Sequence, residues 1–295
     1  MRIVISLLLA VVGSIAGVVL LSYGGGYTMF QLSRFGAEGG AGAYPLLIGL
    51  GVLLLAAAAF SVRWSPVGII VAGAAHVLFS LLAILVPFSP LDGVQSPAVQ
   101  LLNALFDVDP ALAAGAFYFV SFGGGALIGF ALLGAGLLAR RARPGVLWRV
   151  LSAIGGLIAL GPAVWAFAAG GDFYRRTFQL LAWDAVTAVV LVVAALVFGL
   201  VLAPSGRSAI GAWIAGGILS LIGVVLLVVD PVAYADLPAV VQQTLPTLGW
   251  TGTILAVGMS VLGLALGVTL RPASAPLAPA VEPTPPAQDA APEAV

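Results

Sequence analysis

The chain contains neither cysteine nor lysine and only one histidine. Without cysteine it can form no disulfide, no thiolate nucleophile and no Cys-ligated metal or iron–sulfur site. One histidine excludes a multi-histidine metal site and bis-histidine haem ligation. The sequence also has no nucleotide-binding glycine loop with lysine, no His-Glu metal helix and no Ser, His and Asp at recognisable spacing. We therefore expect no cofactor and assign no catalytic or metal-binding residue, although an enzyme acting on a lipid-linked substrate stays open.

Charged residues are also scarce. Charged residues make up 7% of the chain and hydrophobic residues 62%, with a mean hydropathy of +1.19, whereas a soluble domain carries roughly 25% charged residues. No water-soluble fold could bury that much apolar surface, so we expect the chain to lie in a lipid bilayer. The formal net charge is zero, and no nucleic-acid partner is indicated. The all-arginine basic set, with the excess of Ala, Gly, Val and Pro, indicates a bacterial genome of high GC content.

Eight apolar runs are long enough to cross a membrane, which takes about 20 residues for about 30 Å of hydrocarbon. They lie near residues 3–22, 44–62, 66–88, 111–139, 150–170, 178–203, 209–229 and 250–270. The first begins like a signal peptide, but it is too long and lacks a nearby cleavage site, so we expect an uncleaved span. The sequence thus predicts an all-α polytopic membrane protein with eight transmembrane helices in four hairpins.

Arginine placement predicts the orientation, because Lys and Arg near span ends stay on the cytoplasmic side. With the N-terminus inside, only Arg34, Arg175 and Arg176 fall outside. The cytoplasmic set is Arg2, Arg63, Arg140, Arg141, Arg143, Arg149, Arg207 and Arg271. We therefore expect a multi-pass protein of the bacterial plasma membrane with both termini cytoplasmic.

Two of the external loops carry helix signals. In the first, Ser96 is a natural N-cap before Pro97, and an apolar stripe follows at Val99, Leu102, Leu105 and Phe106. In the second, Asp236 precedes Pro238, and Pro246 is expected to end the helix early. Each helix is interpreted either as a plug on the outer rim or as a lid over an external cavity.

Short motifs recur in the two halves of the chain. The matches pair Pro97-Ala98-Val99 with Pro238-Ala239-Val240, Arg2 with Arg149, Gly24 with Gly171, Tyr27 with Tyr174, Phe30-Gln31-Leu32 with Phe178-Gln179-Leu180, Arg63 with Arg207, Gly68 and Gly73 with Gly211 and Gly216, and Gly129 with Gly263. Four spans per half would make this a parallel repeat about an axis along the membrane normal. We expect four-helix halves at 1–139 and 140–270, with chance similarity in so repetitive a composition as the alternative.

The C-terminal residues 271–295 differ in composition from the rest. They are rich in Pro and Ala and too poor in hydrophobic residues to form a core. We expect a disordered cytoplasmic tail, which serves either as a bare tether or as a docking segment for a cytoplasmic partner.

Glycines fall in two patterns. Pairs four residues apart, at Gly13 and Gly17, Gly125 and Gly129, and Gly263 and Gly267, indicate close helix packing. The run Gly123-Gly124-Gly125, and Gly155-Gly156 with Gly161-Pro162, predict either kinks or unwound segments that line a cavity.

His76 is the first candidate functional residue. It lies ten residues into the third span, about 15 Å deep, with Ser80 one turn further along the same face. An ionisable group at such depth costs about 2.5–3.5 kcal/mol and needs a partner or water. His76 is interpreted either as a structural imidazole bonded to a neighbouring helix or as a group that accepts a proton or contacts a substrate.

Asp184 is the second candidate, about 9 Å into the sixth span. Its expected partner is Arg175 or Arg176, or Arg34 from the other half. The pair is interpreted either as an ion pair that closes the outer end of the bundle or as a cation or proton site open to the outside.

The scarcity of intramembrane polar residues favours one function class. We expect a non-enzymatic scaffold or accessory component of the cell envelope, with a membrane-protein partner or a second copy of the chain. The alternative is a small-solute transporter or permease with a site between the halves near His76 and Asp184. A wet cavity reaching both residues would favour transport, and a closed apolar bundle with glycine pairs facing lipid would favour association.

Overall fold

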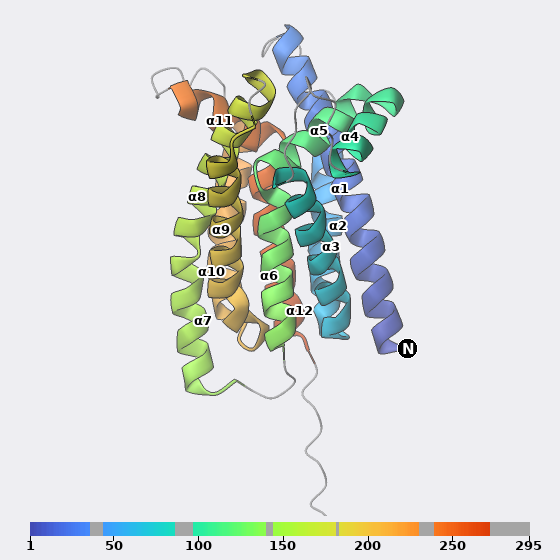
Figure 1. Ribbon diagram of the computed structural model, residues 1–295. Helices are drawn as coiled ribbons and strands as arrows, with labels where there is room; N and C mark the ends of the chain where they lie inside the picture. The colour runs from blue at the N-terminus through green and yellow to red at the C-terminus, as the bar shows by residue number, and fades with distance from the viewer. Residues whose placement is uncertain (36–43, 86–96, 140–143, 181–182, 230–238, 272–295) are drawn as a thin grey trace, which may run out of the picture.

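The computed structural model describes residues 1–35, 44–85, 97–139, 144–180, 183–229 and 239–271. Within these ranges the chain is helical and contains no strand (Figure 1). The predicted tail beyond residue 271, and the helix starts predicted at Ser96 and Asp236, lie outside the described residues.

The helices follow one another along the chain in an up-and-down bundle with shorter helices at one end (Figure 1). Their bounds are α1 Arg2–Phe35, α2 Tyr44–Phe60, η2 Ser61–Arg63, α3 Pro66–Ile84, α4 Pro97–Val108, α5 Pro110–Ser121, α6 Gly124–Leu138, α7 Val146–Ile158, α8 Leu160–Tyr174, η3 Arg175–Gln179, α9 Ala185–Leu202, η4 Ala203–Gly206, α10 Ile210–Val228, α11 Ala239–Trp250 and α12 Thr253–Thr269.

Six helical segments of the described part are long and apolar enough to cross a membrane. They are Arg2–Gln31, Tyr44–Arg63, Pro66–Ile84, Val146–Thr177, Ala185–Gly206 and Ile210–Val228. Two bent pairs, α5 with α6 and the end of α11 with α12, bring the number to eight if each pair is one span. The prediction of a helical, multi-pass membrane protein is confirmed, but the fourth and eighth spans are not the continuous helices that their hydropathy predicts.

Gly123 and Gly252 stand at the two bends. Their φ angles are +78° and +68°, a left-handed conformation that costs residues with a Cβ atom roughly 1–2 kcal/mol. The helix axes turn by 56° at the first break and by 55° at the second. The glycine run at 123–125 therefore makes a sharp kink, whereas the helix continues through Gly155, Gly156 and Gly161 as one candidate span.

Two predicted helix boundaries are wrong. Pro246 lies inside α11, which continues to Trp250, because a membrane helix can tolerate the hydrogen bond that proline loses. The sixth span begins at Ala185 and not near residue 178. The preceding segment contains the π-helical turn Arg175–Gln179, and the described residues Trp183 and Asp184 are not helical.

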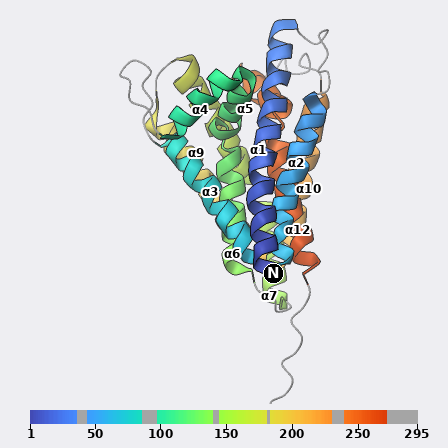
Figure 2. The ribbon, with the colours of Figure 1, turned by 90° about the vertical axis from the view of Figure 1, so that its right-hand side faces the viewer.

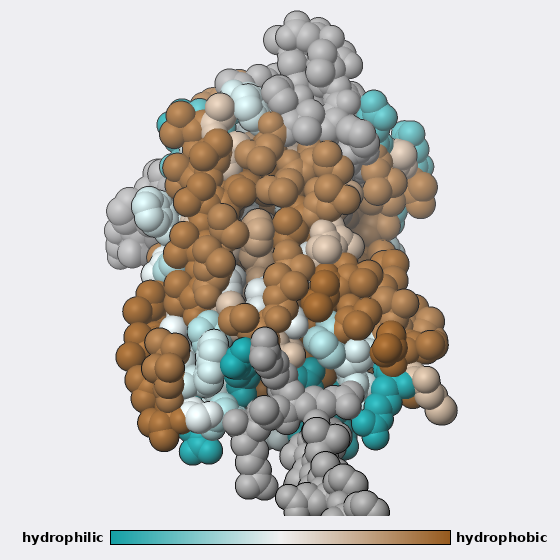
Figure 3. All heavy atoms as spheres, turned by 60° about the horizontal axis from the view of Figure 1, so that its bottom comes forward, coloured by the Kyte–Doolittle hydropathy of each residue, from teal (hydrophilic) through white to brown (hydrophobic). Residues whose placement is uncertain are grey.

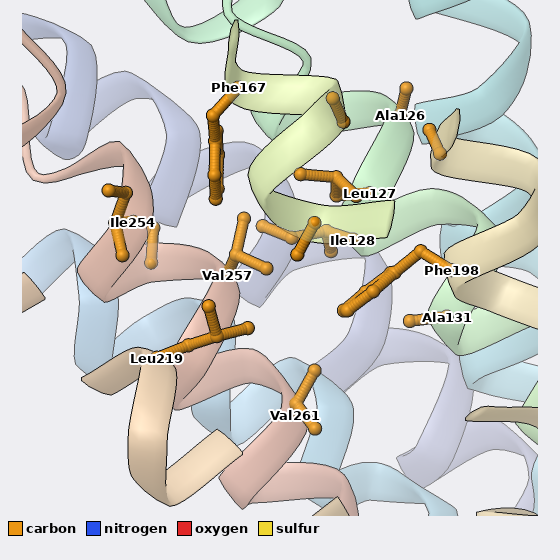
Figure 4. Packing of buried hydrophobic residues seen from close by; sticks show 14 of the residues in the cluster. Ala126, Leu127, Ile128, Ala131, Phe167, Phe198, Leu219, Ile254, Val257 and Val261 are labelled. Atoms are coloured by element: carbon orange, nitrogen blue, oxygen red, sulfur yellow. The ribbon is translucent and has the colours of Figure 1, made fainter. Parts of the chain in front are cut away.

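The core lies around the two central helices, α6 and α12 (Figures 1 and 4). The helix α6 packs on α9, where a methyl group added to Gly134 would stand 2.8 Å from the carbonyl oxygen of Gly199. The helix α12 packs on α2, where a methyl group added to Gly267 would stand 2.7 Å from the carbonyl oxygen of Phe60. The helices α6 and α12 thus each pack closely against a helix that is distant in the sequence, α9 and α2 respectively.

The contacts within each half also match. A methyl group added to Gly73 in α3 would stand 2.9 Å from the carbonyl oxygen of Gly129 in α6. In the second half, one added to Gly216 in α10 would stand 3.0 Å from the carbonyl oxygen of Gly258 in α12. The third and fourth spans therefore approach each other through glycine in both halves.

A buried serine ties the first span of each half to the loop after the second. Ser6 of α1 donates a hydrogen bond to the carbonyl oxygen of Ser65 over 2.7 Å, and Ser152 of α7 donates one to that of Ser208 over 2.5 Å. Both serine side chains are inaccessible to solvent. A hydroxyl in this position satisfies backbone groups that would otherwise be unpaired at a helix end.

Polar and apolar surfaces separate along the bundle axis. Figure 3 shows hydrophilic residues gathered at the end that carries the N-terminus and hydrophobic residues over the flanks. At that end Arg271 donates to the carbonyl oxygen of Val62 over 2.8 Å, and the guanidinium of Arg207 lies 4.0 Å from the ring centre of Trp148. The flanks match what lipid contact requires.

Candidate functional site

A cavity of about 350 Å³ lies beside α3 and is bounded by α1, α3, α4, α5 and Gly125 of α6. Its volume falls in the range of small-molecule sites, about 300–1,000 Å³. Its walls are mainly apolar, with Val18 and Phe79 from the long helices and Leu105 and Phe119 from the shorter ones. All five helices belong to the first half of the chain.

Divergence of two parallel helices creates this space. Near their N-terminal ends α1 and α3 cross closely, because Gly68 lets α3 contact the carbonyl oxygen of Ser6. Further along, α3 leans away from α1, and α4 and α5 lie across the wider end (Figure 2). Leu101 and Leu105 of α4 line the cavity, and Leu105 belongs to the apolar stripe predicted from the sequence.

Four buried polar atoms in this cavity have no hydrogen-bond partner. They are the Oγ atoms of Ser14, Ser22 and Ser80 and the Nε2 atom of His76, which we call the cavity quartet. They make up half of the eight such side-chain atoms in the described part of the chain. Buried polar groups are rarely unpaired, because each costs about 1–3 kcal/mol, so the clustering of four in one cavity makes this cavity the candidate site.

The quartet forms a ladder along the cavity. Ser14 follows Ser6 by eight residues and His76 follows Gly68 by eight, so both stand about 12 Å above the helix crossing. Ser80 lies about 6 Å above that level and Ser22 about 12 Å above it. Polar groups are thus presented at three heights on otherwise apolar walls.

Several other buried hydroxyls of the bundle are paired, although those of Thr177 and Ser220 are not. Ser260 in α12 donates to the carbonyl oxygen of Ala256 over 2.7 Å, and Thr28 in α1 donates to that of Gly24 over 2.8 Å. This bond to the preceding turn is the ordinary way to satisfy a hydroxyl in a membrane helix. The quartet serines do not use it.

The cavity opens sideways toward the surface that lipid would cover. Ile15 and Val19 of α1 line it and are 63% and 45% exposed, and Leu101 of α4 lines it and is 54% exposed. A molecule dissolved in the bilayer can therefore enter this cavity without crossing the aqueous phase.

Asp184 stands just before the candidate span Ala185–Gly206 and not six residues inside a span, as the sequence predicted. It is the N-cap of α9, where its carboxylate accepts the amide of Val186, and it forms an ion pair with Arg176 over 3.0 Å. Arg175 pairs instead with Asp172 over 3.3 Å. Arg34 belongs to α1, but its side chain lies outside the described residues. Asp184 does not line the cavity that reaches His76 and Ser80.

A second cavity, of about 460 Å³, lies against the opposite face of α5, near the C-terminal end of α1. Aromatic residues Tyr27, Phe30, Phe106 and Tyr118 line it. The Tyr27 hydroxyl donates to Asp109 over 3.2 Å, and that of Tyr118 is bonded to Tyr174 over 3.4 Å. The two tyrosine hydroxyls of its lining thus already have hydrogen-bond partners, unlike the cavity quartet.

Sequence reasoning selected His76 and Ser80 but missed Ser14 and Ser22. The available signal was the spacing of Ser14 and Ser22, which are eight residues apart and so about 80° from each other around α1. Serine costs little in a membrane helix, and only the tertiary structure distinguishes a paired serine such as Ser6 from an unpaired one.

Comparison with models of protein families, with curated proteins and with solved structures gives no match to this chain.

Proposed function

We propose that this protein binds a membrane-dissolved ligand in the cavity beside α3. The observation that carries the proposal is the cavity quartet, four buried polar atoms without partners in one laterally open, apolar space. A ligand that supplies these hydrogen bonds would remove a cost that the free protein bears. We retain the interpretation of the chain as a non-enzymatic membrane component, which now has a specific site.

We further propose that the chain consists of two similar four-span halves, 1–139 and 140–270, in parallel orientation. Support comes from the matched glycine contacts of Gly73 and Gly216 and from the two left-handed glycines at the bends. The packing of α6 on α9 and of α12 on α2 gives further support, because each pair joins the fourth span of one half to the second span of the other. In this repeat Gly129 of the first half corresponds to Gly258 of the second half, and not to Gly263. The quartet has no counterpart in the second half, where Leu160 follows Ser152 by eight residues as Ser14 follows Ser6.

Transport and a scaffold role are the other functions that the sequence suggests, and the structure supports them to different degrees. Transport of a small solute between the halves is less favoured, because Asp184 is paired at the rim and the cavity lies within one half. A scaffold role through glycine pairs facing lipid has less support too, since Gly13, Gly125 and Gly263 face neighbouring helices of the bundle. A scaffold role through the tail or through a second copy of the chain is compatible with ligand binding.

We also propose that the N-terminal end of the bundle faces the cytoplasm of a bacterial cell. The described arginines support this, because Arg63, Arg149, Arg207 and Arg271 stand at helix ends on that side. Since the chain has no cysteine, single cysteines can report the orientation without background. In spheroplasts, a membrane-impermeant maleimide should label Val108→Cys and should label Gly145→Cys only after lysis. The reverse pattern would show that the bundle is inverted.

The test of ligand binding uses two neighbouring exposed alanines in α3. Ala75 lines the cavity and Ala74 does not, so Ala75→Phe should fill the cavity while Ala74→Phe presents the same ring to lipid. We expect the wild type and Ala74→Phe, purified from membranes in mild detergent, to retain a common small molecule that organic extraction and mass spectrometry detect. Ala75→Phe should retain it at a several-fold lower level. The same extract from all three proteins would contradict the proposal.

A further inference from the structure

We infer that the ligand of the cavity beside α3 is an uncharged amphiphile whose oxygen atoms bond to Ser14, Ser22, His76 and Ser80. Its apolar chain leaves between α1 and α4 into the bilayer. The inference rests on the proposed function and specifies the chemical class of the ligand.

The lining excludes a charged head group. Among the described residues, no Arg, Asp or Glu lines the cavity. A carboxylate or phosphate placed there would lose its hydration without gaining a counter-ion, and even a single charge at membrane depth costs several kcal/mol. Fatty acid anions and phospholipid head groups are therefore poor occupants, whereas alcohols, esters and quinones carry no such penalty.

The quartet can satisfy either hydrogen-bonding role in a neutral ligand. Each serine hydroxyl donates one hydrogen bond and accepts others, and the imidazole Nε2 atom donates or accepts according to its tautomer. Ser80 and Ser22 are 1% and 2% exposed, so neighbouring side chains of the lining must move apart when a ligand oxygen bonds to them. Carbonyl oxygens, which only accept, and hydroxyl groups, which do both, fit this set.

The ladder geometry favours oxygens at more than one position on the ligand. His76 and Ser14 share one height, and Ser80 stands about 6 Å above them. A ring with oxygens on opposite edges, such as a benzoquinone, can bond at both heights, whereas a simple alcohol reaches only one. The exposed side chains of Ile15 and Leu101 mark where a tail would leave the cavity.

A series of single-chain ligands with different heads, three of which share the hexadecyl chain, tests whether the cavity excludes charged heads. The melting temperature of the full-length protein in mild detergent is measured with hexadecanol, hexadecanoate at pH 8, hexadecyl phosphate and decyl benzoquinone. We expect hexadecanol to raise it and decyl benzoquinone to raise it further, with no shift from the two anions beyond that of detergent alone. An equal shift from hexadecanoate or hexadecyl phosphate would overturn the inference, as would no shift from either uncharged compound.

Variants of the quartet give a second test, because they should raise the melting temperature of the free protein and reduce the shift that a ligand causes. Removing a polar group that lacks a partner should stabilise the free protein, so Ser80→Ala and His76→Leu should each raise the ligand-free melting temperature by about 2 °C or more. The same variants should lose at least half of the shift caused by decyl benzoquinone. Destabilised free variants with an unchanged shift would refute the assignment.

Two control serines separate the effect of an unpartnered hydroxyl on stability from the effect of a cavity residue on ligand binding. Ser220→Ala removes an unpartnered hydroxyl outside the cavity, so it should stabilise the free protein and keep the full ligand shift. Ser260→Ala removes a paired hydroxyl and should leave the shift unchanged without raising the melting temperature. If Ala75→Phe abolishes ligand retention but the cavity does not exclude charged heads, the proposed function stands and only the ligand class is wrong.

Discussion

Replacing Gly115 by alanine is expected to lower the free energy of unfolding by about 2–3 kcal/mol, as overpacking of a close contact does. A methyl group there would overlap the carbonyl oxygen of Ser22, and Gly26 meets the carbonyl oxygen of Ala111 in the same way. Both partners are backbone atoms, so no rotamer change can relieve the overlap. The loss is large against a total stability of about 5–15 kcal/mol. Unfolding midpoints in mixed micelles with increasing denaturing detergent would measure it.

The matched control is Gly49→Ala in α2. No atom lies within 4 Å of the added methyl group, and alanine is the better helix former, so this variant should be as stable as the wild type or more so. Equal stability of Gly115→Ala and Gly49→Ala would mean that α1 and α5 do not approach as closely as described.

Replacing Phe198 by alanine is expected to cost about 3 kcal/mol, at the low end for buried phenylalanine. The ring is fully buried and extends from α9 toward the space between Ile128 of α6 and Val261 of α12 (Figure 4). In a bilayer the unfolded helices also contact apolar surroundings, so what is lost is close packing and not hydrophobic transfer. The unfolding midpoint under the same conditions provides the measurement.

The control for Phe198 is Leu200→Ala, two residues along the same helix. Leu200 is 62% exposed on the flank of the bundle, where lipid replaces the deleted atoms, so the expected change is within about 0.5 kcal/mol. A comparable loss at both positions would place the cost in the helix itself and not in the core around α6 and α12.

Hydropathy predicted the helical membrane class because the bilayer imposes it. A span needs a minimum number of apolar residues, and the runs beginning near Tyr44, Pro66 and Ile210 meet that requirement whatever their neighbours are. The bends could not be placed in the same way. Of 38 glycines in the sequence, Gly123 and Gly252 have positive φ within the described residues, and tertiary packing selects them.

The candidate site was predicted in part. His76 stands out in any sequence with one histidine, and Ser80 follows from helical spacing. Asp184 was misplaced because hydropathy counts Leu180 and Trp183 as part of a span, although the aspartate itself is a strong helix N-cap signal. The missing partners of Ser14 and Ser22 depend on the divergence of α1 and α3, which no local pattern encodes.

The packing of α12 against α2 sets a constraint on biosynthesis. The chain leaves the ribosome N-terminus first, at about 5–20 residues per second. About 200 residues separate the end of α2 from the end of α12, so α2 waits about 10–40 s for the helix that covers it. During that interval its packing surface is open to membrane chaperones and proteases, and the N-terminal half becomes a finished structure only when the C-terminal half has been inserted.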